Sequence, residues 1–324
     1  MSRVTGGRGF GRGRGPGRGL GLDVRELTVT SRDGARLHVE VYGEEGAPAV
    51  VLAHGWTCSI GFWAAQIREL SRDFRVVAYD QRGHGRSPDS GAYAVEGLAD
   101  DLEAVLTATL APGEKAVLAG HSMGGMTIMA AAGRPAVAEH AAAVLLCSTG
   151  SARLAAESLV LPLRAGRLRT RLTRAVLGAT APLGPVTPVS RAVLKYVTMG
   201  RGTSPERVSQ CARIVHACPR QARVGWSHVL AGLDLVRGVG ELRVPVAVVA
   251  GADDRLTPPV HAREIEAALR QSLGLTLLTG VGHMTPVEAP EVVNGRIREL
   301  MDSYVVASAS ASASAGVGVG EEVA

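Results

Sequence analysis

Residues 115–133 read KAVLAGHSMGGMTIMAAAG, and this stretch decides the fold. It opens with a short apolar run that is typical of a strand buried on both faces, and it closes with the apolar spacing of a helix. Between the two lies GHSMG (120–124), which matches G-x-S-x-G at a strand-to-helix turn. Such a strained turn pushes a serine side chain outward, and its glycines allow close backbone approach. We therefore predict that Ser122 is a nucleophile.

The alternation of strand and helix extends on both sides of this stretch. Helical patterns separate most of the other apolar runs, which lie at 49–53, 74–80, 141–147 and 244–251. Alternating strands and helices predict an α/β fold with a mostly parallel sheet flanked by helices. Upstream, residues 24–30 and 35–43 alternate with a period of two, which predicts a hairpin of two strands.

One interval is too long for an ordinary connection. About 90 residues separate the runs at 141–147 and 244–251, which predicts an insertion. Residues 151–204 hold eight Arg and one Lys against a single acid, Glu157. Helical apolar spacing within this segment favours a small helical lid over about residues 151–225.

Composition limits the organisation and the partners of the chain. A length of 324 residues with 46% hydrophobic content suits one domain, which we place at 22–305. The Gly/Arg-rich residues 1–21 and the Ala/Ser/Gly-rich residues 306–324 are predicted to be disordered tails. The first tail holds five Arg and no acid, so the remainder is nearly neutral and a nucleic-acid partner is not expected. An RNA contact through the Arg-rich tail is the alternative.

Four cysteines, Cys58, Cys147, Cys211 and Cys218, are spaced too irregularly for a disulfide framework or a zinc site. No apolar stretch approaches the roughly 20 residues that span a bilayer, and the N-terminus has no secretory h-region. These features predict a cytoplasmic protein without a transmembrane segment. We expect neither a metal nor a cofactor.

A serine nucleophile needs a base that takes its proton and an acid that holds the base. Two loops follow predicted strands, GADDRLTP (251–258) and GVGHM (280–284), and both lie at the carboxyl edge, where open α/β sheets build their sites. We predict that His283 is the base. Asp253 and Asp254 are both candidates for the acid.

The reaction also needs fixed donors for the developing oxyanion. The backbone N–H of Trp56 follows the strand at 49–53, and that of Met123 follows the serine, so both are candidates. Leu256 and Met284 adjoin the acid and the histidine in sequence. Together with Trp56 and Met123 they are the candidate substrate-binding residues.

These motifs resemble those of the α/β-hydrolase superfamily, in its lid-bearing group of serine esterases and lipases, over roughly residues 25–303. HGWTCSIGFW is similar to the oxyanion loop, GHSMGG to the nucleophile turn and GVGHMTPVEAP to the histidine loop. The family's acid loop, G-x-x-D-x-x-x-P, implies Asp254 as the acid and Asp253 as its neighbour. Asp80 and Arg82 resemble a structural turn. Serine at the nucleophile position disfavours dehalogenase and epoxide hydrolase activity.

The resulting hypothesis is hydrolysis of a carboxylic ester, with a lipophilic acyl group, through an acyl-enzyme on Ser122. The alternatives are a cofactor-free perhydrolase, a carbon–carbon bond hydrolase on the same triad, and a non-catalytic ligand-binding protein. The expected partner is a small-molecule ester. The basic lid would also allow peripheral contact with lipid.

Overall fold

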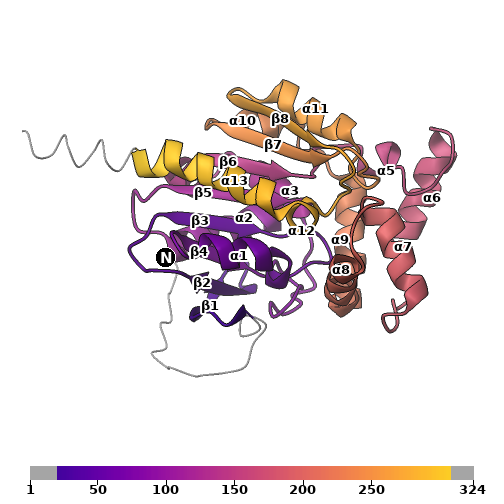
Figure 1. Ribbon diagram of the computed structural model, residues 1–324, viewed down its shortest axis with the longest axis horizontal. Coiled ribbons are helices and arrows are strands. Elements are labelled where there is room, and N and C mark those ends of the chain that lie inside the picture. Colours follow the sequence, from indigo (N-terminus) through magenta and orange to yellow (C-terminus); the bar gives the residue numbers. More distant parts are fainter. Residues whose placement is uncertain (1–19, 308–324) are drawn as a thin grey trace, which may run out of the picture.

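An eight-stranded sheet organises the chain, and the computed structural model describes residues 20–307 (Figure 1). The expected tails, 1–21 and 306–324, lie almost entirely outside these residues. The strands follow the spatial order β1-β2-β4-β3-β5-β6-β7-β8. They are β1 (Val24–Thr30), β2 (Arg36–Tyr42), β3 (Ala49–Ala53), β4 (Arg75–Tyr79), β5 (Ala116–His121), β6 (Ala141–Cys147), β7 (Val246–Gly251) and β8 (Ser272–Leu278).

The direction of the strands confirms the predicted sheet. Strand β2 pairs antiparallel with both β1 and β4, and every other neighbouring pair is parallel. The hairpin predicted upstream is formed by β1 and β2, with Val24 opposite Tyr42. The parallel strands bring their carboxyl ends to one edge, which is where the expected site loops begin.

Helices cover both faces of the sheet. One face carries α2 (Val95–Thr109), α3 (Met123–Ala130), α4 (Pro135–His140), α10 (Val236–Glu241) and α11 (Pro259–Ala268). The other carries the 3-10 helix η2 (Ile60–Trp63), α1 (Ala64–Leu70), α12 (Thr285–Glu288), α13 (Pro290–Met301) and the π-helix η3 (Asp302–Val306). Successive strand residues point to opposite faces, so Val51 packs in the first core and Val50 in the second.

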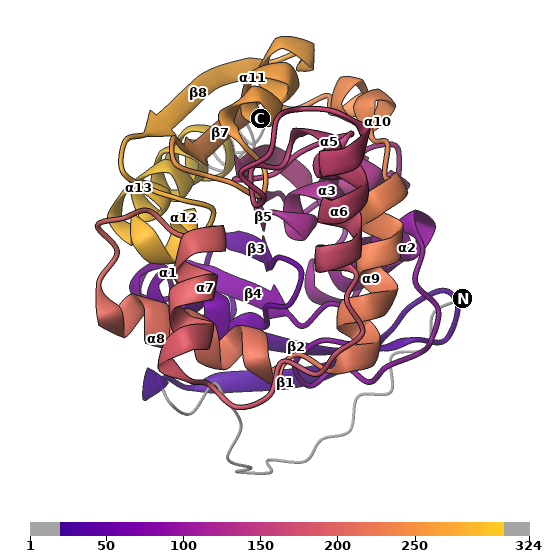
Figure 2. The same cartoon turned by 90° about the vertical axis from the view of Figure 1, so that its right-hand side faces the viewer.

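Five of the six helices between β6 and β7 lie within residues 154–232, which we call the insertion. They are α5 (Leu154–Glu157), α6 (Arg167–Leu177), α7 (Pro188–Thr198), α8 (Pro205–Ala217) and α9 (Arg220–Gly232). Figure 2, which faces the insertion, shows α6 to α9 in front of the strands. The expected boundary at residue 225 falls within α9.

The helical spacing predicted near the start of the insertion corresponds to a shorter helix. Helix α6 begins only at Arg167, and residues 158–166 are irregular. Pro162 has no N–H to give to a helix, which accounts for the shortening. Across residues 20–307, no helix combines the length and the apolar character needed to cross a membrane.

Candidate active site

Ser122 lies at the sharp turn between β5 and α3. Its backbone has φ 52° and ψ −117°, a conformation that non-glycine residues rarely adopt. Neighbouring backbone packs tightly on the turn, because a Cβ at Gly124 would lie 2.0 Å from Ala53 O. The Ser122 N–H donates to Cys147 O at 3.0 Å. The surrounding strands therefore hold the serine in its strained conformation.

A chain of short polar contacts joins Ser122 to His283 and an aspartate. His283 Nε2 lies 3.0 Å from Ser122 Oγ, and His283 Nδ1 lies 2.8 Å from Asp254 Oδ2. All three residues are buried. Asp253, in contrast, is exposed. The geometry thus separates the two acids that the residues alone left open.

The Asp254 carboxylate is held by several donors. Its Oδ1 accepts from the N–H groups of Leu256 at 2.8 Å and Thr257 at 2.9 Å, and its Oδ2 accepts from Thr257 Oγ1 at 2.9 Å. With Asp254 accepting from Nδ1–H, the His283 Nε2 lone pair faces the serine hydroxyl. This arrangement can remove a proton from Ser122.

A buried glutamate supports the loop that carries His283. Glu288 Oε1 accepts from Gly282 N and Met284 N, each at 3.1 Å. Its Oε2 accepts from Gly200 N at 2.8 Å and Thr203 Oγ1 at 2.6 Å, both in the insertion. Glu288 therefore ties the histidine loop to the insertion. Sequence reasoning missed it, because a single acid in a Pro-flanked helical turn is usually exposed.

Two more contacts position His283 itself. The end of α7 accepts its N–H, with Thr198 O at 2.7 Å. His121 Nε2 donates to the His283 carbonyl at 2.9 Å, and the His121 ring stacks on Phe62 with centroids 4.5 Å apart. Burial holds the pKa of His121 well below its usual range, so the ring is neutral.

Two buried histidines shape the loop that follows β3. His54 Nε2 accepts from Gln81 N at 3.0 Å, and His84 Nε2 accepts from Thr57 N at 3.1 Å. Burial lowers the pKa of His54 to about 3 and that of His84 to about 4. Both rings are therefore neutral at pH 7, and they act as fixed acceptors for backbone N–H groups.

The N–H groups of Trp56 and Met123 have no acceptor among residues 20–307. Trp56 follows β3, and Met123 follows Ser122. The two loops approach each other closely, because a Cβ at Gly55 would lie 3.1 Å from Ser122 Cβ. Free backbone donors beside the serine are what an oxyanion needs.

Asp80 and Arg82 hold structural contacts, as the resemblance implied. Asp80 accepts from the N–H groups of Ile60 and Arg86, each at 2.8 Å. Burial raises the pKa of Asp80 to about 6. Arg82 forms ion pairs with Asp101 at 2.6 Å and with Asp33.

A cavity of about 500 Å³ opens beside Ser122 and His283. Trp56, Leu256 and Met284 line it, together with many aliphatic side chains of the insertion. Met123 departs from the expectation, because its side chain is fully buried in the core and does not line the cavity. Met126, one turn later on α3, lines it instead.

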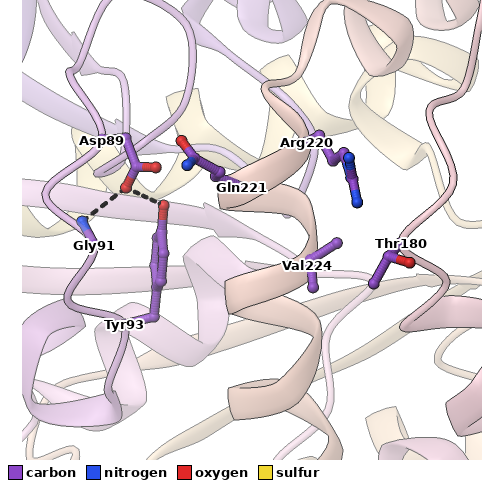
Figure 3. Close-up of a pocket in the computed structure, with 7 residues that line it drawn as sticks. All are labelled: Asp89, Gly91, Tyr93, Thr180, Arg220, Gln221 and Val224. Carbon is purple, nitrogen blue, oxygen red and sulfur yellow. Dashed lines mark hydrogen bonds between the residues drawn. The ribbon is translucent and has the colours of Figure 1, made fainter.

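A second cavity of about 500 Å³ is lined in part by the first turns of α9 (Figure 3). Its lining residues are Asp89, Gly91, Tyr93, Thr180, Arg220, Gln221 and Val224. The Asp89 carboxylate accepts from Tyr93 OH and, at 2.8 Å, from Gly91 N. This lining contains no Ser, Cys or His, so we place the chemistry in the cavity beside Ser122.

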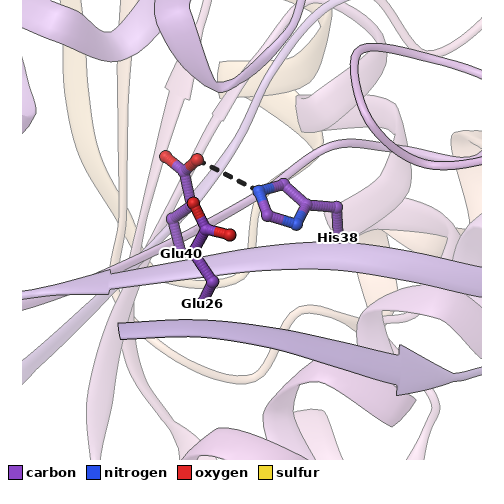
Figure 4. A group of neighbouring side chains, drawn as sticks. All are labelled: Glu26, His38 and Glu40. Carbon is purple, nitrogen blue, oxygen red and sulfur yellow. Dashed lines mark hydrogen bonds and ion pairs between the residues drawn. The ribbon is translucent and has the colours of Figure 1, made fainter. Parts of the chain in front are cut away.

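One group of metal-binding side-chain types occurs within residues 20–307, namely Glu26, His38 and Glu40 on β1 and β2 (Figure 4). His38 Nε2 lies 3.0 Å from Glu40 Oε1. Arg86 Nη1 donates to Glu26 Oε1 at 2.7 Å and lies 3.7 Å from Glu40 Oε1. A guanidinium therefore already supplies positive charge to this group.

The fold and the Ser–His–Asp arrangement are similar to those of hydrolases built on an α/β sheet. The α/β hydrolase family model matches residues 50–296. The chain belongs to the α/β hydrolase family, and this membership supports a hydrolytic activity.

Two curated relatives show how far the similarity reaches. "Putative carbamate hydrolase RutD" of Variovorax paradoxus is 30% identical over 84% of this chain and 97% of its own length. "3-oxoadipate enol-lactonase 1" of Acinetobacter baylyi is 36% identical, but that match covers only 33% of this chain and 40% of the lactonase.

Solved structures agree on the fold. The esterase RhEst1 from Rhodococcus sp. ECU1013 has a TM-score of 0.71 at 22% identity, over 87% of this chain and 100% of that one. The enol-lactonase from Burkholderia xenovorans LB400 has a TM-score of 0.68 at 25% identity, over 85% of this chain and 100% of that one.

Proposed function

We propose that this chain is a serine hydrolase that cleaves a carboxylic ester through an acyl-enzyme on Ser122. The observation that carries the proposal is the continuous hydrogen-bonded chain from Ser122 Oγ through both nitrogens of His283 to Asp254. The strained backbone of Ser122 supports it, because an unusual conformation held by many neighbours is typical of functional sites.

The proposed reaction has two halves. Ser122 Oγ attacks the ester carbonyl as His283 Nε2 takes its proton, and Asp254 stabilises the imidazolium. The N–H groups of Trp56 and Met123 hold the oxyanion, and His283 then gives its proton to the departing alcohol. Water, deprotonated by His283, attacks the acyl-enzyme and releases the carboxylic acid, which restores the serine.

The cavity favours a lipophilic acyl group, and we propose that the insertion acts as its lid. Each acyl methylene that the aliphatic walls remove from water contributes about 0.8 kcal/mol. Medium-chain esters should therefore have a higher kcat/KM than acetyl esters. The exposed apolar and basic side chains of α6 and α7 also suit peripheral contact with lipid.

Carbamate hydrolysis is a second candidate, favoured by the similarity to RutD over most of the chain. A carbamate also presents a carbonyl to Ser122, but its carbonyl carbon is bonded to nitrogen where that of a carboxylic ester is bonded to carbon. A cavity of about 500 Å³ with mostly aliphatic walls favours the ester. Turnover of a carbamate above that of an ester of the same alcohol would reverse this ranking.

The experiment that tests the proposal is labelling with a fluorophosphonate, followed by turnover of p-nitrophenyl butanoate. Ser122→Ala should abolish labelling and reduce turnover by about a thousandfold or more while the protein stays folded. Ser227→Ala is the matched control, because Ser227 lines the same cavity but donates to Val224 O at 2.7 Å. Undiminished turnover in purified Ser122→Ala would refute the proposal.

A further inference from the structure

Residues 151–204, which cover the first part of the insertion, carry positive charge that is mostly unpaired within residues 20–307. Of the eight Arg in residues 151–204, only Arg153 forms an ion pair within the described part of the chain, with Glu264 at 2.6 Å and Glu157 at 3.7 Å. The other seven have no carboxylate partner there. Unpaired positive charge attracts anions, and it does so most strongly where it borders a cavity.

Arg223 on α9 adds a further cation at the cavity beside Ser122. The residue is only 6% exposed and lines the cavity. Its Nη1 donates to Ala179 O at 2.7 Å and its Nη2 to Ala181 O at 2.5 Å. No carboxylate within residues 20–307 forms an ion pair with it. The guanidinium is thus fixed in place by two neutral carbonyls, and its charge is not balanced.

Arg223 is also linked to the loop after β3. The Trp56 indole N–H donates to the Arg223 carbonyl at 3.0 Å, and both residues line the cavity. A guanidinium has five N–H donors, and two of them are used by the carbonyls, so three remain. The position of Arg223 is therefore set before any ligand enters.

A second guanidinium lines the same cavity from α6. Arg174 Nη2 donates to Ala231 O at 3.2 Å, and Arg174 has no carboxylate partner among the described residues. The cavity lining contains no Asp or Glu. Two cationic residues thus line a cavity whose remaining lining is mostly apolar.

We propose that the substrate is an amphiphilic ester, with an apolar chain and an anionic group that Arg223 and Arg174 bind. Buried charges are normally paired, since an unpaired buried ion is strongly destabilising. A carboxylate on the substrate would complete the pair through charge-assisted hydrogen bonds. This inference rests on the proposed ester hydrolysis at Ser122, and it names the substrate class.

The test compares esters that differ in one terminal group, which is a carboxylate in one member of the pair and neutral in the other. The first pair, 4-nitrophenyl pentanoate and mono-4-nitrophenyl glutarate, places the carboxylate on the acyl side. The second pair, 4-(pentanoyloxy)benzoate and its methyl ester, places it on the alcohol side. The measured quantity is the ratio of kcat/KM for the anionic ester to that for the neutral ester, in the wild type and in each variant.

In at least one pair, Arg223→Gln should lower this ratio about tenfold, chiefly through the KM of the anionic ester. The pair that responds identifies the side that carries the anion. Arg169→Gln is the matched control. Arg169 is also 6% exposed and donates to a carbonyl, Ala156 O, but it does not line the cavity, so the ratio should stay unchanged.

An unchanged ratio in both pairs for folded Arg223→Gln would overturn the inference. If that variant does not fold, the more exposed Arg174→Gln decides: a drop of about threefold supports the inference, and no drop overturns it. Failure of the underlying hydrolase proposal is distinguishable, because Ser122→Ala would then still hydrolyse both members of a pair.

Discussion

The edge of the sheet and the insertion that faces it are built in opposite ways. At the sheet edge, the side chains of the proposed triad are buried and held by named partners, as in the contacts from Asp254 to His283 and from His283 to Ser122. The insertion, in contrast, holds ten of the fifteen exposed large hydrophobic residues in the described chain. Side chains held in a fixed geometry are suited to catalysing the cleavage of a bond, and an exposed apolar surface is suited to binding an apolar ligand. We infer that the sheet edge determines the reaction and the insertion the substrate.

The largest expected effect lies at the sheet edge. Asp254→Asn should lower kcat by about a hundredfold or more, because the amide no longer stabilises the imidazolium or fixes the tautomer of His283. Asp253→Asn, at the exposed neighbouring position, should stay within about twofold of the wild type. Steady-state kinetics with p-nitrophenyl butanoate measures both. The reverse order would move the acid to Asp253.

Glu288 connects the two regions, so its replacement tests whether they act separately. Glu288→Gln replaces one of the two acceptor oxygens by an NH2 group. The single oxygen that remains cannot accept from both the histidine loop and Gly200. We expect kcat to fall about tenfold with a smaller change in KM, together with a lower Tm. Glu291→Gln, at an exposed position on α13, is the control. Wild-type kcat in Glu288→Gln would show that the two regions are independent.

A smaller effect should come from the insertion alone. Val193 lines the cavity from α7 and is 57% exposed. Val193→Ser should lower the ratio of kcat/KM for octanoyl to acetyl esters about threefold, because less apolar surface is buried with the long chain. Val186→Ser lies in the insertion outside the cavity lining and should leave the ratio unchanged. An equal loss for both chain lengths would contradict an acyl-binding role.

The smallest expected effect is on the pH dependence of stability, and it too belongs to the sheet edge. The pKa values of His54 and His84 are lowered to about 3 and about 4, below the roughly 6.5 of the unfolded chain. The unfolded chain therefore binds more protons below about pH 6.5, and the free energy of unfolding falls as the pH falls towards 4. Asp80, whose pKa is raised to about 6, opposes this trend.

Thermal unfolding between pH 7.5 and 4.5 measures the net effect. We expect Tm to fall on acidification, and His84→Gln to reduce the fall by about 3 °C, because it removes one buried group that resists protonation. Glutamine keeps an acceptor for the N–H of Thr57. A Tm that rises on acidification in the wild type would contradict the assignment.

Local sequence was enough to predict the groups at the sheet edge. A strand, a tight turn and a helix are formed by neighbouring residues, so the motif at 120–124 already placed Ser122 at a turn. The histidine loop was equally readable, since His283 follows a strand by a few residues. The position of Asp253 and Asp254 after the strand left both open as the acid, and the resemblance to the family's acid loop favoured Asp254.

The contacts that the sequence did not reveal join residues that are far apart along the chain. Glu288 binds residues near 200, and His121 binds the carbonyl of His283; no local pattern marks such pairs. Met123 was expected in the cavity, but the direction of its side chain depends on how α3 packs against the sheet.

The sequence by itself determined the sheet, the turn at Ser122 and the order of the site loops, because periodicity and turn chemistry act over a few residues. Only the tertiary structure decided that Met126 lines the cavity in place of Met123, that Asp253 is exposed while Asp254 contacts His283, and that Arg223 lies buried with no carboxylate partner among residues 20–307. Each of these contacts joins segments that are far apart in the sequence. The packing of those segments sets the direction in which their side chains point.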